Sequence, residues 1–167
     1  NNTLTVTSAL AGTGGLTQAA NATLNIGFTG AFGITTLNAN ANGNTVNYNF
    51  AGVQTVKAPA TTYYNLTLST SGVKTLAAAT AVNGDILVSG TATLADGTFG
   101  ITGALGKTFT LGAGTAYTST KTTDPCFPTN MTFALDVAST VNLNGTGTFT
   151  FTLFPTSFGN LVFGAGA

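Results

Sequence analysis

Residues 44–76 read NTVNYNFAGVQTVKAPATTYYNLTLSTSGVKTL. Apolar and polar side chains alternate along this stretch, first as Val46, Tyr48 and Phe50 between asparagines. A period of two is typical of β-strands, because successive side chains of a strand point to opposite faces of its sheet. Each alternating run is short and gives way to small or turn-forming residues. The stretch therefore predicts several short strands that follow one another closely.

The same alternation recurs along the rest of the chain. Its apolar members are Leu4 and Val6; Leu24, Ile26 and Phe28; Tyr64, Leu66 and Leu68; Phe109 and Leu111; Phe133, Leu135 and Val137; Val141 and Leu143; and Phe149, Phe151 and Leu153. Turn-forming pairs separate the runs, and these are Asn42-Gly43, Asn83-Gly84, Asp96-Gly97 and Asn144-Gly145. Thr, Gly and Asn, all poor helix formers, supply 74 of the 167 residues. Pattern and composition together predict an all-β chain.

The polar positions of the strands favour one β architecture over another. They carry Thr and Asn, and only 5% of the residues are charged, whereas a soluble monomer usually has about a quarter. Like side chains on adjacent strands hydrogen-bond one another, so Thr and Asn suit stacked rungs. We therefore predict a parallel β-solenoid with short rungs. The alternative is a β-sandwich or jelly-roll subunit that is completed by a donated strand.

An internal repeat supports stacked rungs. Residues 44–72 align without gaps on residues 139–167, with nine identities that include Thr45 with Thr140 and Asn65 with Asn160. Self-similarity of this kind is the signature of repeat architectures. We expect one continuous domain, with a strand-repeat region over 1–121 and a Phe-rich region over 122–167 that partly repeats 44–72.

Residues 44–76, followed by Val82-Asn83-Gly84-Asp85-Ile86, resemble the repeats of large bacterial cell-surface β-strand repeat proteins. Those repeats carry similar TVNY, QTVK, TYYNLTLS and VNGDL stretches. The resemblance covers roughly residues 1–120 and implies a parallel β-helix in an extracellular adhesin or surface polymer without a catalytic site. Residues 121–167 depart from it, with Cys126, two close prolines and a cluster of Phe.

The charged residues exclude several classes of function. Four Lys balanced by four Asp cannot form the basic face that nucleic-acid binding requires, and the absence of His removes His-dependent chemistry. The acids are dispersed, so no run of oxygen ligands for calcium exists. Asp85 and Asp96 both lie beside Gly and are expected in turns, and they are the only pair of acids that adjacent rungs could bring together. We expect no enzyme, no cofactor and no metal site.

Other features bear on the cellular setting. No apolar run reaches the ~18 residues of a membrane helix. The chain begins at Asn1 without a signal peptide, so we expect a leader to have been removed or the chain to be part of something longer. Cys126 has no internal disulfide partner and is either a buried small hydrophobe or a link between subunits. Surface glycans are a possible partner of this chain. The five Asn-x-Ser/Thr sequons are about the number that composition alone gives, so they predict no glycosylation of the chain itself.

We expect an extracellular or cell-surface structural protein, a subunit or repeat of a self-assembling filament or adhesin. In the repeat, Asn1-Asn2-Thr3-Leu4 of a following copy would take the place of Val73-Lys74-Thr75-Leu76, which predicts head-to-tail association by strand pairing. The alternative is a Thr-rich carbohydrate- or ice-binding solenoid, although the Thr-x-Thr motifs are irregularly spaced along the sequence. The predicted assembly interface consists of Leu4, Val6, Leu10, Phe149, Phe151, Phe158, Leu161 and Phe163.

Overall fold

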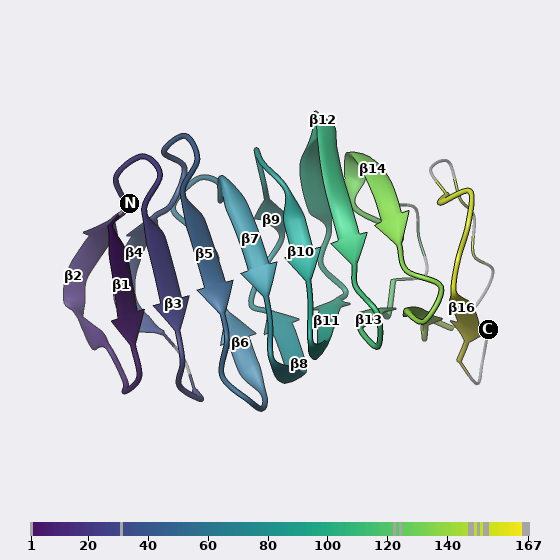
Figure 1. The fold of residues 1–167 in the computed structure, drawn as a ribbon, viewed down its shortest axis with the longest axis horizontal. Helices are drawn as coiled ribbons and strands as arrows, with labels where there is room; N and C mark the ends of the chain where they lie inside the picture. Colours follow the sequence, from purple (N-terminus) through teal and green to yellow (C-terminus); the bar gives the residue numbers. More distant parts are fainter. Residues whose placement is uncertain are drawn as a thin grey trace.

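The computed structural model describes residues 2–30, 32–121, 123, 125–146, 149, 151 and 154–164. In this part of the chain every strand pairing is parallel and no helix occurs. The chain winds as a coil whose strands stack side by side along one axis (Figure 1). The parallel β-solenoid predicted from the sequence is confirmed, and the sandwich or jelly-roll alternative is not what the chain forms.

The strands fall into two main sheets and one pair. The eight-stranded sheet contains β1 (Thr3–Val6), β3 (Thr23–Ile26), β5 (Thr45–Tyr48), β7 (Asn65–Leu68), β9 (Thr80–Ala81), β10 (Ile86–Val88), β12 (Ile101–Leu111) and β14 (Thr129–Leu135). The six-stranded sheet contains β6 (Gln54–Val56), β8 (Ser71–Leu76), β11 (Thr91–Gly97), β13 (Ala116–Ser119), β15 (Thr140–Leu143) and β16 (Asn160–Phe163). The pair is β2 (Ala11–Thr17) with β4 (Gly33–Asn38).

One turn of the coil takes between about 20 and 24 residues. Thr3 pairs with Thr23 at one end of the eight-stranded sheet, and Thr110 pairs with Ala134 at the other. Turns of different length still deliver each strand to the same level, because the corners absorb the extra residues. Motifs that are unevenly spaced in the sequence are therefore evenly spaced in the structure.

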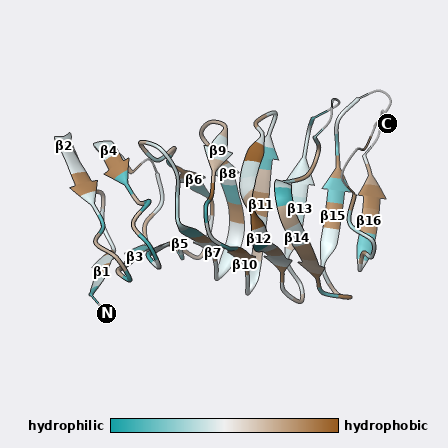
Figure 2. Ribbon diagram, turned by 90° about the horizontal axis from the view of Figure 1, so that it is seen from above, coloured by the Kyte–Doolittle hydropathy of each residue, from teal (hydrophilic) through white to brown (hydrophobic). Residues whose placement is uncertain are grey.

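The in-register pairing stacks apolar side chains into continuous columns. On the inner face of the eight-stranded sheet one column contains Leu4, Leu24, Val46, Leu66, Ile86, Phe109 and Phe133. The column beside it contains Val6, Ile26, Tyr48, Leu68, Val88, Leu111 and Leu135. Most of these residues belong to a single buried core cluster that runs the length of the coil. Figure 2 shows the matching alternation of hydrophobic and hydrophilic residues along strands such as β15.

Close stacking at the corners explains one glycine in particular. Gly72 has a φ of 80° and sits directly against the backbone of the turn below, where an added Cβ would lie 2.4 Å from the Gly52 carbonyl carbon. A side chain at this corner would therefore push two turns apart. Residues 44–76 therefore carry a glycine at a position where a side chain would not fit.

The internal repeat reflects the stacking of rungs, as its use in the sequence analysis implied. The sequence alignment matches β5 with β15, and these two strands belong to different sheets. What the two copies share is the spacing to the next strand, because Thr45 pairs with Asn65 and Thr140 pairs with Asn160. The repeat therefore reflects a shared rung spacing and does not correspond to a whole number of turns. Part of its second copy, including residues 165–167, lies outside the described residues.

We predict that Leu66→Ala lowers the free energy of unfolding by about 2–5 kcal/mol, since it opens a cavity in the middle of a column. Leu66 is 1% exposed. Thr67→Ala on the outer face of the same strand is the matched control and should change stability by less than about 0.5 kcal/mol. Urea unfolding followed by circular dichroism measures both variants. Equal losses of stability would contradict the assignment of inner and outer faces.

Candidate assembly surfaces

The N-terminal end of the solenoid is open. Among the described residues, β1 pairs only with β3 and β2 pairs only with β4, so each has one edge without a strand partner. Leu4, the first residue of an inner column, is 46% exposed. Leu4 is therefore the exposed end of this apolar column among the described residues.

A cavity of about 250 Å³ lies at this end, where the inside of the first turn is accessible. We call it the N-terminal hollow, and its lining includes Leu4, Leu16, Gln18, Ala22 and Leu24. Gln18 is 7% exposed. Its Nε2 donates to the carbonyls of Ala22 at 3.3 Å and Thr45 at 3.1 Å, whereas its Oε1 is buried without a hydrogen-bond partner in the described structure.

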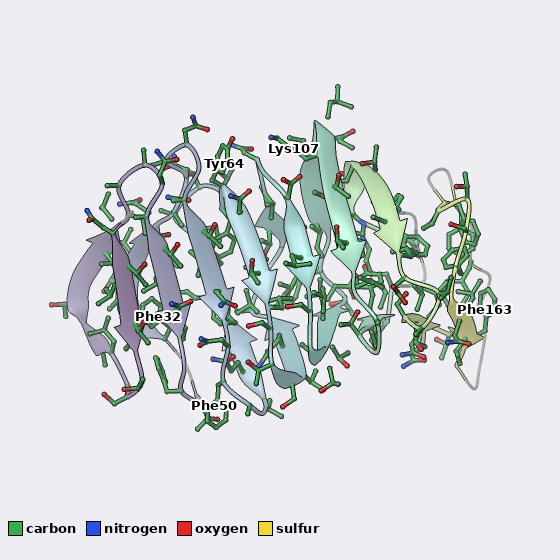
Figure 3. The ribbon with its side chains drawn as sticks, in the orientation of Figure 1. Phe32, Phe50, Tyr64, Lys107 and Phe163 are labelled. Carbon is green, nitrogen blue, oxygen red and sulfur yellow. The ribbon has the colours of Figure 1, made fainter. Side chains whose placement is uncertain are left out.

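The C-terminal end of the solenoid is aromatic. The Phe cluster, as we call it, consists of Phe127, Phe149, Phe151, Phe154, Phe158 and Phe163. Buried Phe127 is its centre, with its ring centroid 5.7 Å from that of Phe154 and 5.9 Å from that of Phe133. Phe154 is 41% exposed and Phe163 is 51% exposed. Figure 3 places Phe163 at the far end of the molecule from β1.

The structure divides the predicted interface residues between the two ends. Leu4, Val6 and Leu10 belong to the first turn, whereas Phe149, Phe151, Phe158, Leu161 and Phe163 belong to the last (Figure 1). Leu4 and Phe163 are exposed, and the other six are half-buried against the core. No residue of one group meets the other group within one chain, as an interface between copies would require.

Sequence reasoning missed Leu16 and Phe154. Leu16 stands among Gly and Thr without alternating apolar neighbours, so no strand pattern selected it. The alternation of Phe149, Phe151 and Leu153 predicts a strand, and in that strand Phe154 would lie on the opposite face from these three residues. Phe149 and Phe151 lie outside the named strands, and Leu153 lies outside the described residues.

The outer face of the eight-stranded sheet carries a regular array of Thr and Asn. One column contains Thr3, Thr23, Thr45, Asn65, Asp85, Thr108 and Thr132, and the other contains Thr5, Asn25, Asn47, Thr67, Leu87, Thr110 and Ala134. Hydrogen bonds link the rungs: Asn47 Nδ2 donates to Asn25 Oδ1 at 3.1 Å, and Asn25 Nδ2 donates to Thr5 Oγ1 at 3.3 Å. These ladders fix the polar side chains of the face at the spacing of neighbouring strands.

Asp96 begins the turn that its Asp-Gly pair predicts, because its carbonyl accepts from the Phe99 N–H at 3.1 Å and Gly97 has a φ of 63°. It is also the last inward-facing residue of β11, and its side chain is 1% exposed, which the turn signal alone does not predict. The register of β11 with β13 shifts between Ala95 and Gly97, so Asp96 lies at an irregularity of that pairing. Asp85 lies on the outer face of the other sheet, where its Oδ1 accepts from the Thr108 N–H at 2.9 Å. The structure therefore does not bring Asp85 and Asp96 together.

The surroundings of Asp96 favour its neutral form. Burial raises the pKa of its carboxyl to about 7, although hydrogen bonds from Tyr117 and Ser119 and the charge of Lys121 oppose the shift. Its Oδ2 accepts from the Tyr117 hydroxyl at 2.5 Å. The Tyr117 hydroxyl is also 2.9 Å from the Cys126 carbonyl, and Cys126 itself is buried. The acid thus helps to anchor the segment that precedes β14.

Other buried polar groups satisfy backbone atoms at the corners. Lys74 Nζ donates to the carbonyls of Phe50 at 2.5 Å and Gly52 at 2.8 Å, and burial lowers the pKa of Lys74 to about 8. Tyr48 accepts from the Lys57 N–H at 2.9 Å, and Tyr63 donates to the Lys57 carbonyl. Burial raises the pKa of Tyr48 to about 12. Lys74 thus ties its strand to the previous turn, whereas Tyr48 and Tyr63 tie the backbone of Lys57 to the core of their own turn.

Metal-binding clusters and membrane-spanning helices are both absent from the described residues. No group of three or more His, Cys, Asp or Glu that could hold a metal occurs among the described residues. Within the same residues, no helix is long and apolar enough to span a membrane. Of the two remaining acids, Asp136 is exposed and Asp124 lies outside the described residues.

Comparison with known proteins gives no relative. No family model, no curated protein and no solved structure matches this chain.

We predict that the protein becomes less stable as the pH rises toward 7. The Asp96 carboxyl ionises near pH 3.8 in the unfolded chain but near pH 7 in the folded one. Between these values unfolding releases a proton, so the free energy of unfolding falls by about 1.4 kcal/mol per pH unit. Asp96→Asn stays neutral and should remove this slope. Urea unfolding at several pH values from 4.5 to about 6.5 tests the prediction, and equal slopes in wild type and variant would contradict it.

Proposed function

We propose that this chain is an extracellular structural protein whose solenoids associate end to end into a filament or an adhesin-like surface polymer. One observation carries the proposal: the two ends of the coil are uncharged and apolar, and each has strand edges without a partner among the described residues. An open apolar end on a solenoid needs a cap or another turn. A second copy of the chain supplies that turn.

The direction of the strands makes such stacking geometrically simple. Because every described pairing is parallel, a copy that moves along the solenoid axis presents strands of the same direction to the free edges of the first. Its first turn then meets the last turn of the neighbour. The contact joins different surfaces of the two copies, so it repeats without closing and produces a linear polymer. Main-chain strand addition of this kind is an established mode of protein association.

The distribution of charge supports stacking at the ends rather than along the sides. Residues 1–56 contain no Asp, Glu, Lys or Arg, and none follows Asp136. All eight charged residues therefore belong to the central part of the chain. Natural proteins protect exposed sheet edges with charge, especially Lys. This chain places its few charges where they leave both ends free for strand pairing.

The extracellular setting rests on composition and on the resemblance of residues 44–76 to bacterial surface repeats. A surface with few charges and many Thr and Asn suits a polymer whose stability comes from regular β-pairing. The buried Cys126 is consistent with the packing role that the sequence analysis left open beside an intersubunit link. Cell-surface location and adhesive function are parts of the proposal that imaging of the native material tests directly.

A second candidate function follows from the Thr and Asn array. Its hydroxyl and amide groups repeat at the strand spacing of about 4.8 Å and at about 6.6 Å along each strand. A rigid periodic ligand, such as a crystalline polysaccharide or ice, could align with such a face. Asp85 and Leu87 interrupt the array in the middle, and ladder hydrogen bonds already engage several of the asparagines. End-to-end assembly is for these reasons the better-supported function.

We predict that Leu4→Lys weakens self-association by at least tenfold, because it places a charge at the open end of an inner column. The control is Leu105→Lys, at a residue that is 85% exposed in the middle of the chain. Sedimentation velocity over a range of concentrations, with electron microscopy of the same samples, measures assembly. Deletion of residues 1–10 should likewise give shorter assemblies or none. Unchanged polymers from Leu4→Lys and from the deletion would refute the role of the N-terminal end.

For the second candidate, we predict that Thr67→Lys reduces co-sedimentation with insoluble cellulose or chitin and reduces inhibition of ice recrystallisation, if either activity is present. Thr75→Lys on the outer face of the six-stranded sheet is the matched control, since both threonines are half-buried strand residues that face outward. A wild-type protein that neither co-sediments nor affects ice growth excludes this function. Equal effects of both variants would contradict the choice of face.

A further inference from the structure

We propose that the exposed ring of Phe154 in one copy enters the N-terminal hollow of the next copy, so that the two ends of the solenoid fit as knob and hole. This inference rests on the proposed end-to-end assembly and names the contact that would hold it. The occupant is a second copy of this chain, and the contact involves Leu4, Leu16, Gln18 and Leu24 on the receiving side.

Column geometry brings these two features onto the same line. Leu4 lines the hollow and is the first member of an inner column whose last member is Phe133. The Phe133 ring contacts Phe127 at 5.9 Å between centroids, and Phe127 in turn contacts Phe154 at 5.7 Å. A copy that is shifted along the solenoid axis continues the column. The shift therefore places the hollow of one copy over the Phe cluster of the other.

The sizes of the two features agree. The hollow has a volume of about 250 Å³. A dry apolar cavity of about 150 Å³ is large enough for benzene. Phe154 is 41% exposed although its ring lies 4.7 Å from that of Phe151 and 4.8 Å from that of Phe158. The ring is thus held in place by its neighbours and still presents an uncovered surface.

Gln18 provides an independent sign that the hollow receives another segment. It is 93% buried, since only 7% of its surface is exposed, and its Oε1 is buried without a partner in the described structure. A buried acceptor without a donor costs free energy, so native proteins usually satisfy it. Because the oxygen is itself buried, a backbone N–H from the entering segment would supply the missing donor once the Gln18 amide turns toward the hollow. The hollow itself offers an apolar seat lined by Leu4, Leu16 and Leu24.

Neither end carries a charged side chain that would oppose the contact. No Asp, Glu, Lys or Arg lines the hollow, and none belongs to the Phe cluster. Ring burial consequently proceeds without the desolvation of a charge. Removal of the Phe154 ring should weaken association by roughly tenfold or more, as expected for the loss of a half-exposed aromatic side chain from an interface.

The test uses two variants that damage opposite ends. Phe154→Ala removes the knob, and Ala19→Phe obstructs the hollow from an exposed lining position. Each variant alone should show at least tenfold weaker polymerisation by sedimentation velocity. An equimolar mixture of the two should form dimers that stop there, because the intact hollow of one variant accepts the intact Phe154 of the other. Phe99→Ala, at a residue that is 36% exposed, is the control and should polymerise as wild type.

Disulfide trapping provides a readout that does not depend on the strength of association. A chain that carries both Ala19→Cys and Thr156→Cys keeps the Phe154 ring and should give a ladder of covalent oligomers under mild oxidation, whereas each single variant should give at most dimers. If wild type polymerises while Phe154→Ala polymerises equally well and no ladder forms, the knob-and-hole contact is wrong and the end-to-end function stands. If wild type remains monomeric at all concentrations, the proposed function fails as well.

Discussion

Register between parallel turns is the constraint on which the rest of the structure depends. Each turn must return its strand to the same level as the one below, so that Leu66 lies between Val46 and Ile86. A slip by one residue would turn every apolar side chain outward. The corners accept turns of between about 20 and 24 residues to avoid this slip. The flat outer face, the continuous core and the open ends all follow from this stacking.

The same stacking explains why buried polar groups occur in so uncharged a protein. Backbone carbonyls at the corners point into the coil, where water does not reach them, and an unpaired one costs free energy. Gln54 and Lys74 therefore extend their side chains to the previous turn, and Gln54 Nε2 donates to the carbonyls of Ile26 at 2.8 Å and Phe28 at 2.9 Å. Burial makes Asp96 and Lys74 easier to neutralise than exposed groups. The charge states of both side chains thus depend on the fold.

Much of this fold could be predicted from the sequence, because alternation in short runs reflects the inner and outer faces directly. Strand direction followed from the Thr and Asn partners, which suit stacked rungs. What could not be predicted depends on contacts between turns. Asp96 begins the turn that its Asp-Gly pair predicts, but the burial of its side chain depends on Tyr117 of the next turn, whose hydroxyl donates to it. Phe154 belongs to the Phe cluster because its ring contacts those of Phe127 and Phe158, and no local pattern encodes these contacts.

A solenoid differs from a globular domain in that its core has ends. Each turn buries its apolar face only against its neighbours, so adding turns lengthens the core without closing it. In this chain the two ends are unlike: one is hollow and lined by Leu4, Leu16 and Leu24, and the other is filled by rings around Phe127. Unlike ends cannot form a symmetric dimer through the same surface, but they can repeat indefinitely in one direction. In the end-to-end assembly that we propose, the contacts that hold successive turns together within the chain would also join one chain to the next.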